Sequence, residues 1–186
     1  MVDGFIDPGT AAALSALGRD TERARLAESD PTINETGFCL EVPIEGAPLL
    51  ETLRERIEGL FEVQSDVYDC IRYRNYRPGE GHPAHLDCYE IEGRELIATA
   101  LLSLRDTPAG GETEFTEVGL AVPPRLGRLL CWYNHSPDGA RDPLSRHGGL
   151  PVVEGEKEVL LYFIYKQKEH AAHRPFAPGE TEVARG

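Results

Sequence analysis

Hydrophobic and polar positions follow a helical period in two places near the start of the chain. Asp7 followed by Pro8 is typical of a helix N-terminus, and residues 11–17 are strong helix formers that end at Gly18. Leucine, isoleucine and phenylalanine recur at helical spacing over residues 49–61, with charged residues between them. The pattern predicts a short first helix and an amphipathic second helix, both backing one face of a sheet.

Short runs rich in β-branched, aromatic and leucine residues follow, broken by proline and glycine. We expect an exposed connection over residues 21–31 and a strand near residues 37–42. Seven further strands are predicted over residues 70–76, 84–89, 96–104, 112–115, 120–122, 128–133 and 158–165. The apolar run 159–165 is typical of a central buried strand. Together these runs predict an all-β sandwich or barrel with N-terminal helices.

The organisation along the chain predicts a single domain over residues 1–169. Residues 1–66 form its helical support and residues 68–166 its β core. Residues 170–186 have little apolar content, which predicts a loosely ordered tail.

Composition and charge exclude two classes of partner. The chain has 186 residues and a formal net charge of −13, which opposes binding to nucleic acid or to an anionic membrane surface. No apolar run approaches the roughly 18 residues of a membrane span, and acidic Asp3 and Asp7 stand where a signal peptide is basic. We therefore expect a cytoplasmic protein. The sequence leaves its oligomeric state open.

The four cysteines show no metal-binding or redox spacing. They are Cys39, Cys70, Cys88 and Cys131, and no two of them form a CxxC pair. Their mostly apolar neighbours favour small buried hydrophobic residues, with a catalytic thiol as the alternative.

One histidine–carboxylate pair carries candidate metal chemistry. On a strand, His85 and Asp87 would point to one face, about 6–7 Å apart. His147 lies between two predicted strands, where a jelly roll would bring it beside the pair. Two histidines and one carboxylate leave open metal positions, as in non-haem Fe(II) oxygenases. Lys157, at the mouth of the barrel, is placed to pair with a dicarboxylate bound to that metal; the alternative is a surface lysine.

Four sequence blocks resemble, in order, the prolyl 4-hydroxylase-like branch of the Fe(II)/2-oxoglutarate-dependent dioxygenases. They are residues 75–79 (NYRPG) leading into 85–87 (HLD), residues 110–115 (GGETEF), residues 122–134 (VPPRLG followed by LCWYN) and residues 147–157 (HGGLPVVEGEK). The resemblance covers roughly half of the chain, from about residue 68 to residue 166.

The resemblance implies a mainly β fold with N-terminal helices, built on a double-stranded β-helix (jelly roll, cupin-like). It implies that His85, Asp87 and His147 bind Fe(II). Lys157 would hold the distal carboxylate of 2-oxoglutarate, and Tyr76 and Thr113 are further candidates for that role. The residues alone allow Tyr76 to be a core aromatic and Thr113 an ordinary strand residue.

The resemblance also implies a reaction. 2-Oxoglutarate and O2 are consumed, succinate and CO2 are released, and an unactivated C–H bond of a prolyl or other amino-acid-type substrate is hydroxylated. That substrate is peptidyl or a small molecule, and ascorbate is the implied reductant.

The chain departs from the family pattern at positions that contact the substrate. His82 stands where tyrosine is common, Phe163 replaces a tryptophan, and Leu96 stands where an arginine is expected, although Arg94 is close by. The iron and cosubstrate residues are therefore kept while the substrate residues are changed, which leaves the substrate open.

Trp132 and Arg146 are further candidates for substrate contact. Their alternatives are a large core aromatic and a solvated arginine. His82 could likewise be an exposed loop histidine.

Two other functions compete with the oxygenase hypothesis. A cupin-like jelly roll could bind metal or ligand without turnover, and a metal-dependent hydrolase or isomerase could use a divalent metal as a Lewis acid. The first would have little reason to keep all three candidate ligands together with Lys157, and the second has no need for Lys157.

Overall fold

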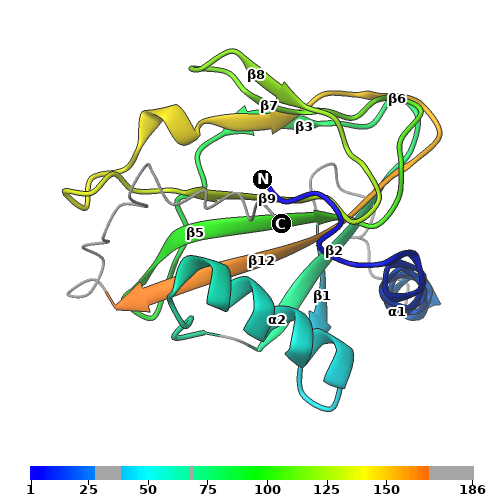
Figure 1. The fold of residues 1–186 in the computed structure, drawn as a ribbon, viewed down its shortest axis with the longest axis horizontal. Helices are drawn as coiled ribbons and strands as arrows, with labels where there is room; N and C mark the ends of the chain where they lie inside the picture. Colours follow the sequence, from blue (N-terminus) through cyan, green and yellow to red (C-terminus); the bar gives the residue numbers. More distant parts are fainter. Residues whose placement is uncertain (28–38, 68, 168–186) are drawn as a thin grey trace, which may run out of the picture.

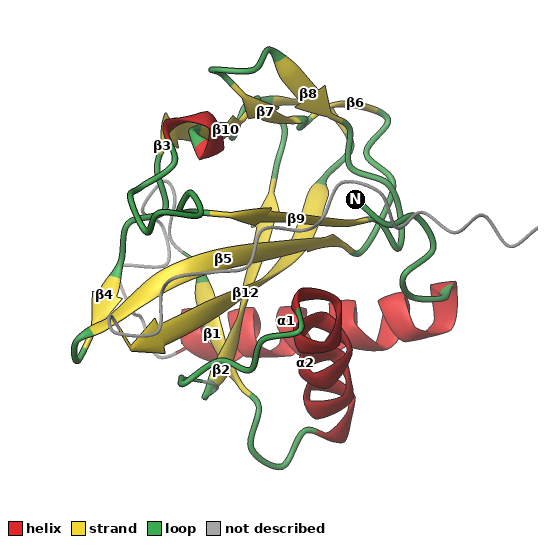
Figure 2. Ribbon diagram, turned by 60° about the vertical axis from the view of Figure 1, so that its left-hand side comes forward, coloured by secondary structure: helices red, strands yellow, loops and turns green. Residues whose placement is uncertain are grey.

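The computed structural model describes residues 1–27, 39–67 and 69–167 (Figure 1). Two helices, α1 (Pro8–Ala27) and α2 (Pro48–Phe61), lie on one side of a large antiparallel sheet, as Figure 2 shows. A smaller sheet faces the opposite side of the large one. The predicted tail over residues 170–186 lies outside the described residues. No helix among the described residues is long and apolar enough to span a membrane.

The large sheet has the order β1-β2-β12-β5-β4, with β9 also paired to β5. Its strands are β1 (Leu40–Pro43), β2 (Cys70–Tyr76), β4 (Glu90–Ile91), β5 (Arg94–Ser103), β9 (Leu129–Tyr133) and β12 (Lys157–Gln167). The long strand β12 lies between β2 and β5 and is buried over most of its length, which confirms the central strand predicted from its apolar run.

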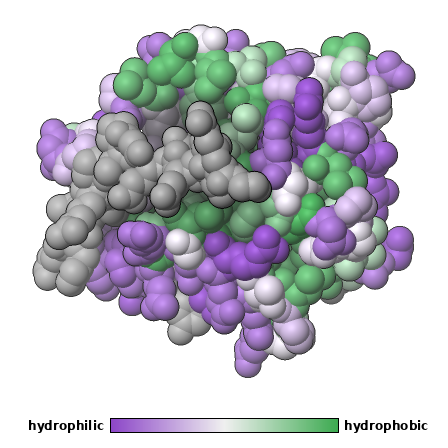
Figure 3. Space-filling view, in the orientation of Figure 1, coloured by the Kyte–Doolittle hydropathy of each residue, from purple (hydrophilic) through white to green (hydrophobic). Residues whose placement is uncertain are grey.

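The small sheet has the order β3-β10-β7-β8, and a separate pair joins β11 to β6. These strands are β3 (His82–His85), β6 (Ala109–Gly110), β7 (Thr113–Phe115), β8 (Leu120–Val122), β10 (His147–Gly149) and β11 (Val152–Glu154). Hydrophobic residues gather at the top of one face, over β7 and β8 (Figure 3). Leu120 and Val118 there are each 51% exposed.

Alternation along the central strands places successive residues in different hydrophobic cores. Leu160, Tyr162 and Ile164 of β12 pack in the core that includes the helices, while Val159 belongs to a second core that lies toward the small sheet. The face that does not carry the helices is therefore available to build a site between the two sheets.

The first helix is longer than the sequence predicts. It begins as expected, with Thr10 N–H donating to the Asp7 carboxylate, but it continues past Gly18 to Ala27. Gly18 does not end the helix; it allows close packing, because a Cβ there would lie 2.2 Å from the Tyr73 ring. The expectation of a connection beginning at residue 21 was therefore wrong for residues 21–27.

We predict that Gly18→Ala destabilises the protein although alanine favours helices. Tyr73 is 1% exposed and its hydroxyl donates to Glu158, so the ring cannot move aside. Overpacking of this kind costs about 1–3 kcal/mol, which exceeds the helix-propensity gain of about 1 kcal/mol. Thermal unfolding should show a lower Tm. Gly59→Ala in α2 is the matched control: nothing lies within 4 Å of its Cβ position, so its Tm should not fall.

The strands differ from the predictions around the candidate metal ligands. Only residues 84–85 of the run predicted over residues 84–89 belong to a strand, at the end of β3, so the prediction was wrong for residues 86–89. Asp87 lies in this irregular segment, and β4 begins after it. His147, predicted between strands, starts the short strand β10. A strand of one histidine and two glycines carries no hydrophobic alternation, which is why the pattern missed it.

Candidate active site

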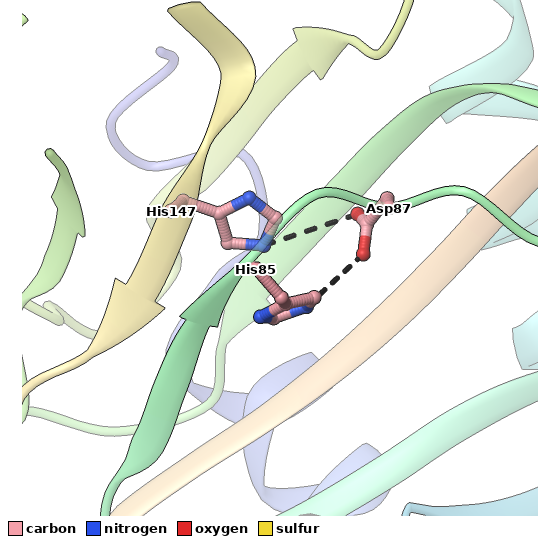
Figure 4. Close-up of side chains that lie close together, drawn as sticks. All are labelled: His85, Asp87 and His147. Atoms are coloured by element: carbon pink, nitrogen blue, oxygen red, sulfur yellow. Dashed lines mark ion pairs between the residues drawn. The ribbon is translucent and has the colours of Figure 1, made fainter. Parts of the chain in front are cut away.

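Two histidines from the small sheet and an aspartate from the segment that follows β3 converge on one point (Figure 4). Register pairs His147 of β10 with His85 of β3, and the chain turns after β3 so that Asp87 faces both rings. One ligand atom from each of the three residues lies within 4.8 Å of the others. The closest approaches are His85 Nε2 to Asp87 Oδ1 at 3.2 Å and His147 Nε2 to Asp87 Oδ2 at 3.9 Å.

Backbone carbonyls fix the orientation of both histidines. His85 Nδ1 lies 2.9 Å from the carbonyl oxygen of Pro83, and His147 Nδ1 lies 2.9 Å from that of Ser145. A carbonyl oxygen can only accept, so each Nδ1 carries a proton and donates it. In the neutral rings each Nε2 therefore presents a lone pair toward Asp87, the arrangement of metal-bound histidines.

Asp87 is the most enclosed of the three groups. Its exposure is 4%, and Thr99 Oγ1 donates to its Oδ2 over 2.6 Å. Burial raises the pKa of Asp87, but the hydrogen bonds from His85 and Thr99 and the charge of His147 outweigh it, so its pKa lies below the ordinary value. The carboxylate therefore stays ionised.

The pKa values of the two histidines are shifted in opposite directions. When His85 is also protonated at Nε2, it donates to Asp87, and this hydrogen bond raises the pKa of His85, whereas burial lowers the pKa of His147. A neutral His147 offers Nε2 as a ligand near neutral pH. A buried carboxylate and two oriented imidazoles form a donor set that suits a divalent iron ion, and they leave other coordination positions open.

A buried lysine lies in the same cavity, which has a volume of about 380 Å³ and is also lined by the three converging residues. Lys157 is 4% exposed, and its Nζ donates to Thr113 Oγ1 over 3.3 Å. Its backbone pairs with Tyr76, whose ring centroid lies 5.5 Å from Nζ. No ion pair of Lys157 occurs among the described residues. A buried ammonium facing a cavity favours an anionic ligand, because an unpaired buried charge is costly.

The other candidate residues fall into two groups. His82 and Phe163 line the cavity, and the His82 ring lies edge-on to His85 with 4.6 Å between centroids. Trp132 packs against His147 at 4.6 Å, and Arg146 is exposed and donates to the Ala84 carbonyl. Within the part of the chain that the structure describes, neither Trp132 nor Arg146 lines the cavity. Trp132 supports the ring of His147, and Arg146 contacts the backbone of β3.

Sequence reasoning missed the residues that hold Asp87 in place. Thr99 is fully buried in β5, and Asn134 Nδ2 donates to Thr99 Oγ1 over 3.1 Å. Asn134 belongs to one of the four recognised blocks, which is the signal that could have drawn attention to it. Thr99 lies inside an apolar strand and gives no such signal.

The family model for the 2OG-Fe(II) oxygenase superfamily matches residues 71–165. The chain belongs to this superfamily. A curated relative, probable prolyl 4-hydroxylase 4 of Arabidopsis thaliana, is 30% identical over 144 residues, covering 63% of this chain and 48% of the relative. The chain spans half or less of the length of the curated relatives that it matches.

Two solved structures share the fold. The viral collagen prolyl hydroxylase of Paramecium Bursaria Chlorella virus-1, in a 2OG complex, has a TM-score of 0.72 and 18% identity, covering 88% of this chain and 93% of that one. A prolyl hydroxylase of Trichoplax adhaerens, in complex with a hypoxia inducible factor peptide fragment, has a TM-score of 0.58 and 14% identity, covering 92% and 84%. The likeness confirms the predicted jelly-roll fold.

Proposed function

We propose that this chain is an Fe(II)- and 2-oxoglutarate-dependent dioxygenase that hydroxylates an unactivated C–H bond of a prolyl or other amino-acid-type substrate. The observation that carries the proposal is the joint presence, in one cavity, of the three converging ligands and the buried Lys157, which has no ion pair within residues 1–27, 39–67 and 69–167. A protein that only bound metal would have no use for the buried cation. Family membership and the prolyl 4-hydroxylase relatives support the same reaction class.

In this proposal the chain's own groups have separate tasks. His85, Asp87 and His147 hold the iron, and Lys157 pairs with the distal carboxylate of 2-oxoglutarate, next to Thr113. When bound, iron would supply the activation of O2 that is coupled to oxidative decarboxylation of 2-oxoglutarate. The cavity walls orient both molecules and exclude water from the reacting C–H bond.

The reaction is tested by its stoichiometric product. Purified protein with Fe(II), 2-oxoglutarate, O2 and ascorbate as reductant should form succinate, faster when an acceptable substrate is present. Succinate formation that depends on both iron and 2-oxoglutarate supports the proposal. Its absence, or a hydrolytic activity that zinc supports equally well, would favour a binding module or a Lewis-acid enzyme.

The proposal predicts a pH dependence for binding of the cosubstrate. Burial lowers the pKa of Lys157 to about 8, so without an anion the amine loses its charge as the pH rises through that value. Only the protonated amine pairs with a carboxylate. The Kd for 2-oxoglutarate should therefore be nearly constant from pH 7 to 8 and rise by up to about tenfold per pH unit above it.

Anaerobic titration of the Fe(II)-loaded protein at several pH values measures this Kd. In Lys157→Met the dependence above pH 8 should disappear, because no titrating group remains at this position. A Kd in the unaltered protein that does not change between pH 7 and 9.5 would contradict the role of Lys157.

A further inference from the structure

The proposed reaction assigns no role to part of the cavity lining. The iron ligands, Lys157, Tyr76 and Thr113 line its inner part. The remaining lining includes one cation and several aromatic side chains, namely Arg72, Tyr89, Phe163 and Tyr165. Such a surface beside a proposed metal site is where a substrate would lie.

Arg72 is fixed in this outer part by three strands. It lies on β2, in register with Glu41 of β1 and Leu161 of β12. Leu161 is four residues along β12 from Lys157, so the two cationic positions are separated by about 13 Å of strand. Backbone positions this far apart leave room for each cation to bind a carboxylate of its own. The cavity therefore offers places for two different anionic groups.

An aromatic ring orients the Arg72 side chain. Its guanidinium carbon lies 4.6 Å from the centroid of the Phe163 ring, and the Tyr89 ring stacks on Phe163 with 6.1 Å between centroids. Stacking on an aromatic face holds a guanidinium in one plane and leaves its edge N–H groups able to donate. Phe163 thus works as a platform for the cation.

The charge of Arg72 is only partly compensated. Its side chain is 19% exposed, while that of its partner Glu41 is 59% exposed, and the Nη2–Oε1 distance is 3.0 Å. Among the described residues this is the single side-chain hydrogen bond of the guanidinium. An exposed partner contributes little, because water screens the pair. Nε and Nη1 have no protein partner within that part of the chain.

Two carboxylates near the opening could instead attract a cationic substrate. Both Glu41 and Glu90 line the cavity, but both are exposed residues, and Glu41 is already paired with Arg72. Arg72 is the more buried charge of the outer part, so its interaction with a ligand is screened less. A carboxylate offers a guanidinium the stronger, geometrically matched pair of hydrogen bonds.

We propose that Arg72 is a specificity-determining residue that binds a carboxylate of the substrate, so that this chain acts on amino-acid-type molecules bearing a free carboxylate near the reacting carbon. The inference rests on the proposed function. Phe163 connects the two ends of the arrangement, since it pairs across the sheet with Thr99, whose hydroxyl holds Asp87. The place of Arg72 in the cavity is therefore linked to the proposed iron position through Phe163 and Thr99.

The test compares matched acid and amide probes on the protein loaded anaerobically with Fe(II) and 2-oxoglutarate. The probes are L-proline and L-prolinamide, N-acetylglycyl-L-proline and its amide, and an amidated peptide with glutamate next to proline. Calorimetry measures each Kd. The two acid–amide pairs and the glutamate peptide, compared with its glutamine counterpart, distinguish a free amino acid, a C-terminal residue and an acidic side chain as the source of the carboxylate.

We expect at least one carboxylate probe to bind more tightly than its amide or neutral counterpart. Arg72→Gln should weaken that binding roughly 10- to 100-fold and leave the Kd for 2-oxoglutarate unchanged. Arg72→Lys keeps the charge without the planar guanidinium, so its Kd for the carboxylate probe should lie between those of the unaltered protein and Arg72→Gln. The matched control Arg23→Gln, on the exposed part of α1, should change neither value.

A second variant separates substrate binding from a structural role for Arg72. Glu41 competes for the guanidinium, so Glu41→Gln should tighten binding of the carboxylate probe, whereas loss of a merely structural ion pair would not.

Three results would overturn the role of Arg72: equal binding of acids and amides, no binding of any carboxylate probe, or weaker binding in Glu41→Gln. A wild-type protein that binds neither Fe(II) nor 2-oxoglutarate would instead overturn the proposed function, and this inference with it.

Discussion

Asp87→Ala should reduce Fe(II) affinity by more than about 100-fold and remove succinate formation. Asp87 is the group that faces both imidazoles, at 3.2 Å from His85 and 3.9 Å from His147. Loss of a residue that only supports a metal ligand already costs 10- to 100-fold in affinity, so loss of the charged ligand itself should cost more. Anaerobic equilibrium binding of Fe(II), with iron measured directly, gives the effect.

Two further variants make the Asp87 result specific. Asp20→Ala removes a carboxylate that is 68% exposed on α1 and should bind iron normally. Thr99→Val removes the hydroxyl that donates to Asp87 Oδ2 and should weaken iron binding by about 10- to 100-fold. Iron binding by Asp87→Ala equal to that of the unaltered protein, with an unchanged thermal unfolding transition, would exclude this residue as a ligand.

Lys157→Met should retain iron but lose 2-oxoglutarate. Methionine keeps the length of the aliphatic stem, which packs near Gly111, and removes only the charge. A bound dicarboxylate would then leave one carboxylate buried without a partner, which costs about 3–5 kcal/mol. The Kd for 2-oxoglutarate should therefore rise at least about 100-fold, as measured by anaerobic titration.

The same strand provides a control for Lys157. Lys166 of β12 donates to Asp66, and Lys166→Met should leave the Kd for 2-oxoglutarate unchanged. If Lys157→Met bound 2-oxoglutarate as tightly as the unaltered protein, the buried amine would have a different task and the cosubstrate assignment would be wrong.

Periodicity predicted the elements that bury one face. Helix α2 was predicted from the spacing of its leucine, isoleucine and phenylalanine residues, and β2 and β8 have the bounds that their apolar runs predicted. The predicted end of the first helix at Gly18 was wrong, because a glycine that ends a helix cannot be told by sequence from a glycine that makes room for a neighbouring ring. The presence of Tyr73 against it depends on tertiary packing.

The site was predicted by motif, and its geometry was not. The blocks named His85, Asp87, His147 and Lys157, and the structure brings all four to one cavity. The sequence placed Asp87 on a strand, but a carboxylate that must meet two rings from β3 and β10 requires the chain to leave the strand after His85. Alternation along a strand could not predict that turn.

Residues that act from neighbouring strands were beyond sequence reasoning. Arg72 reads as one charged residue in an alternating strand, and its position over Phe163 exists only because β2 and β12 are paired. Thr99 is likewise defined by its distance to Asp87 and by nothing in its own segment. Both depend on strand order and register, which this sequence does not encode in any local pattern.

The most direct test of the account is an anaerobic titration of the metal-free protein with Fe(II) and then 2-oxoglutarate. Chelation of ferrous iron by a 2-oxo acid gives a weak visible charge-transfer band. The account predicts that this band forms, saturates at one 2-oxoglutarate per iron, and is strongly weakened in Lys157→Met at the same concentrations. Iron binding without the band, or no iron binding at all, would contradict the central claim that this cavity holds both iron and 2-oxoglutarate.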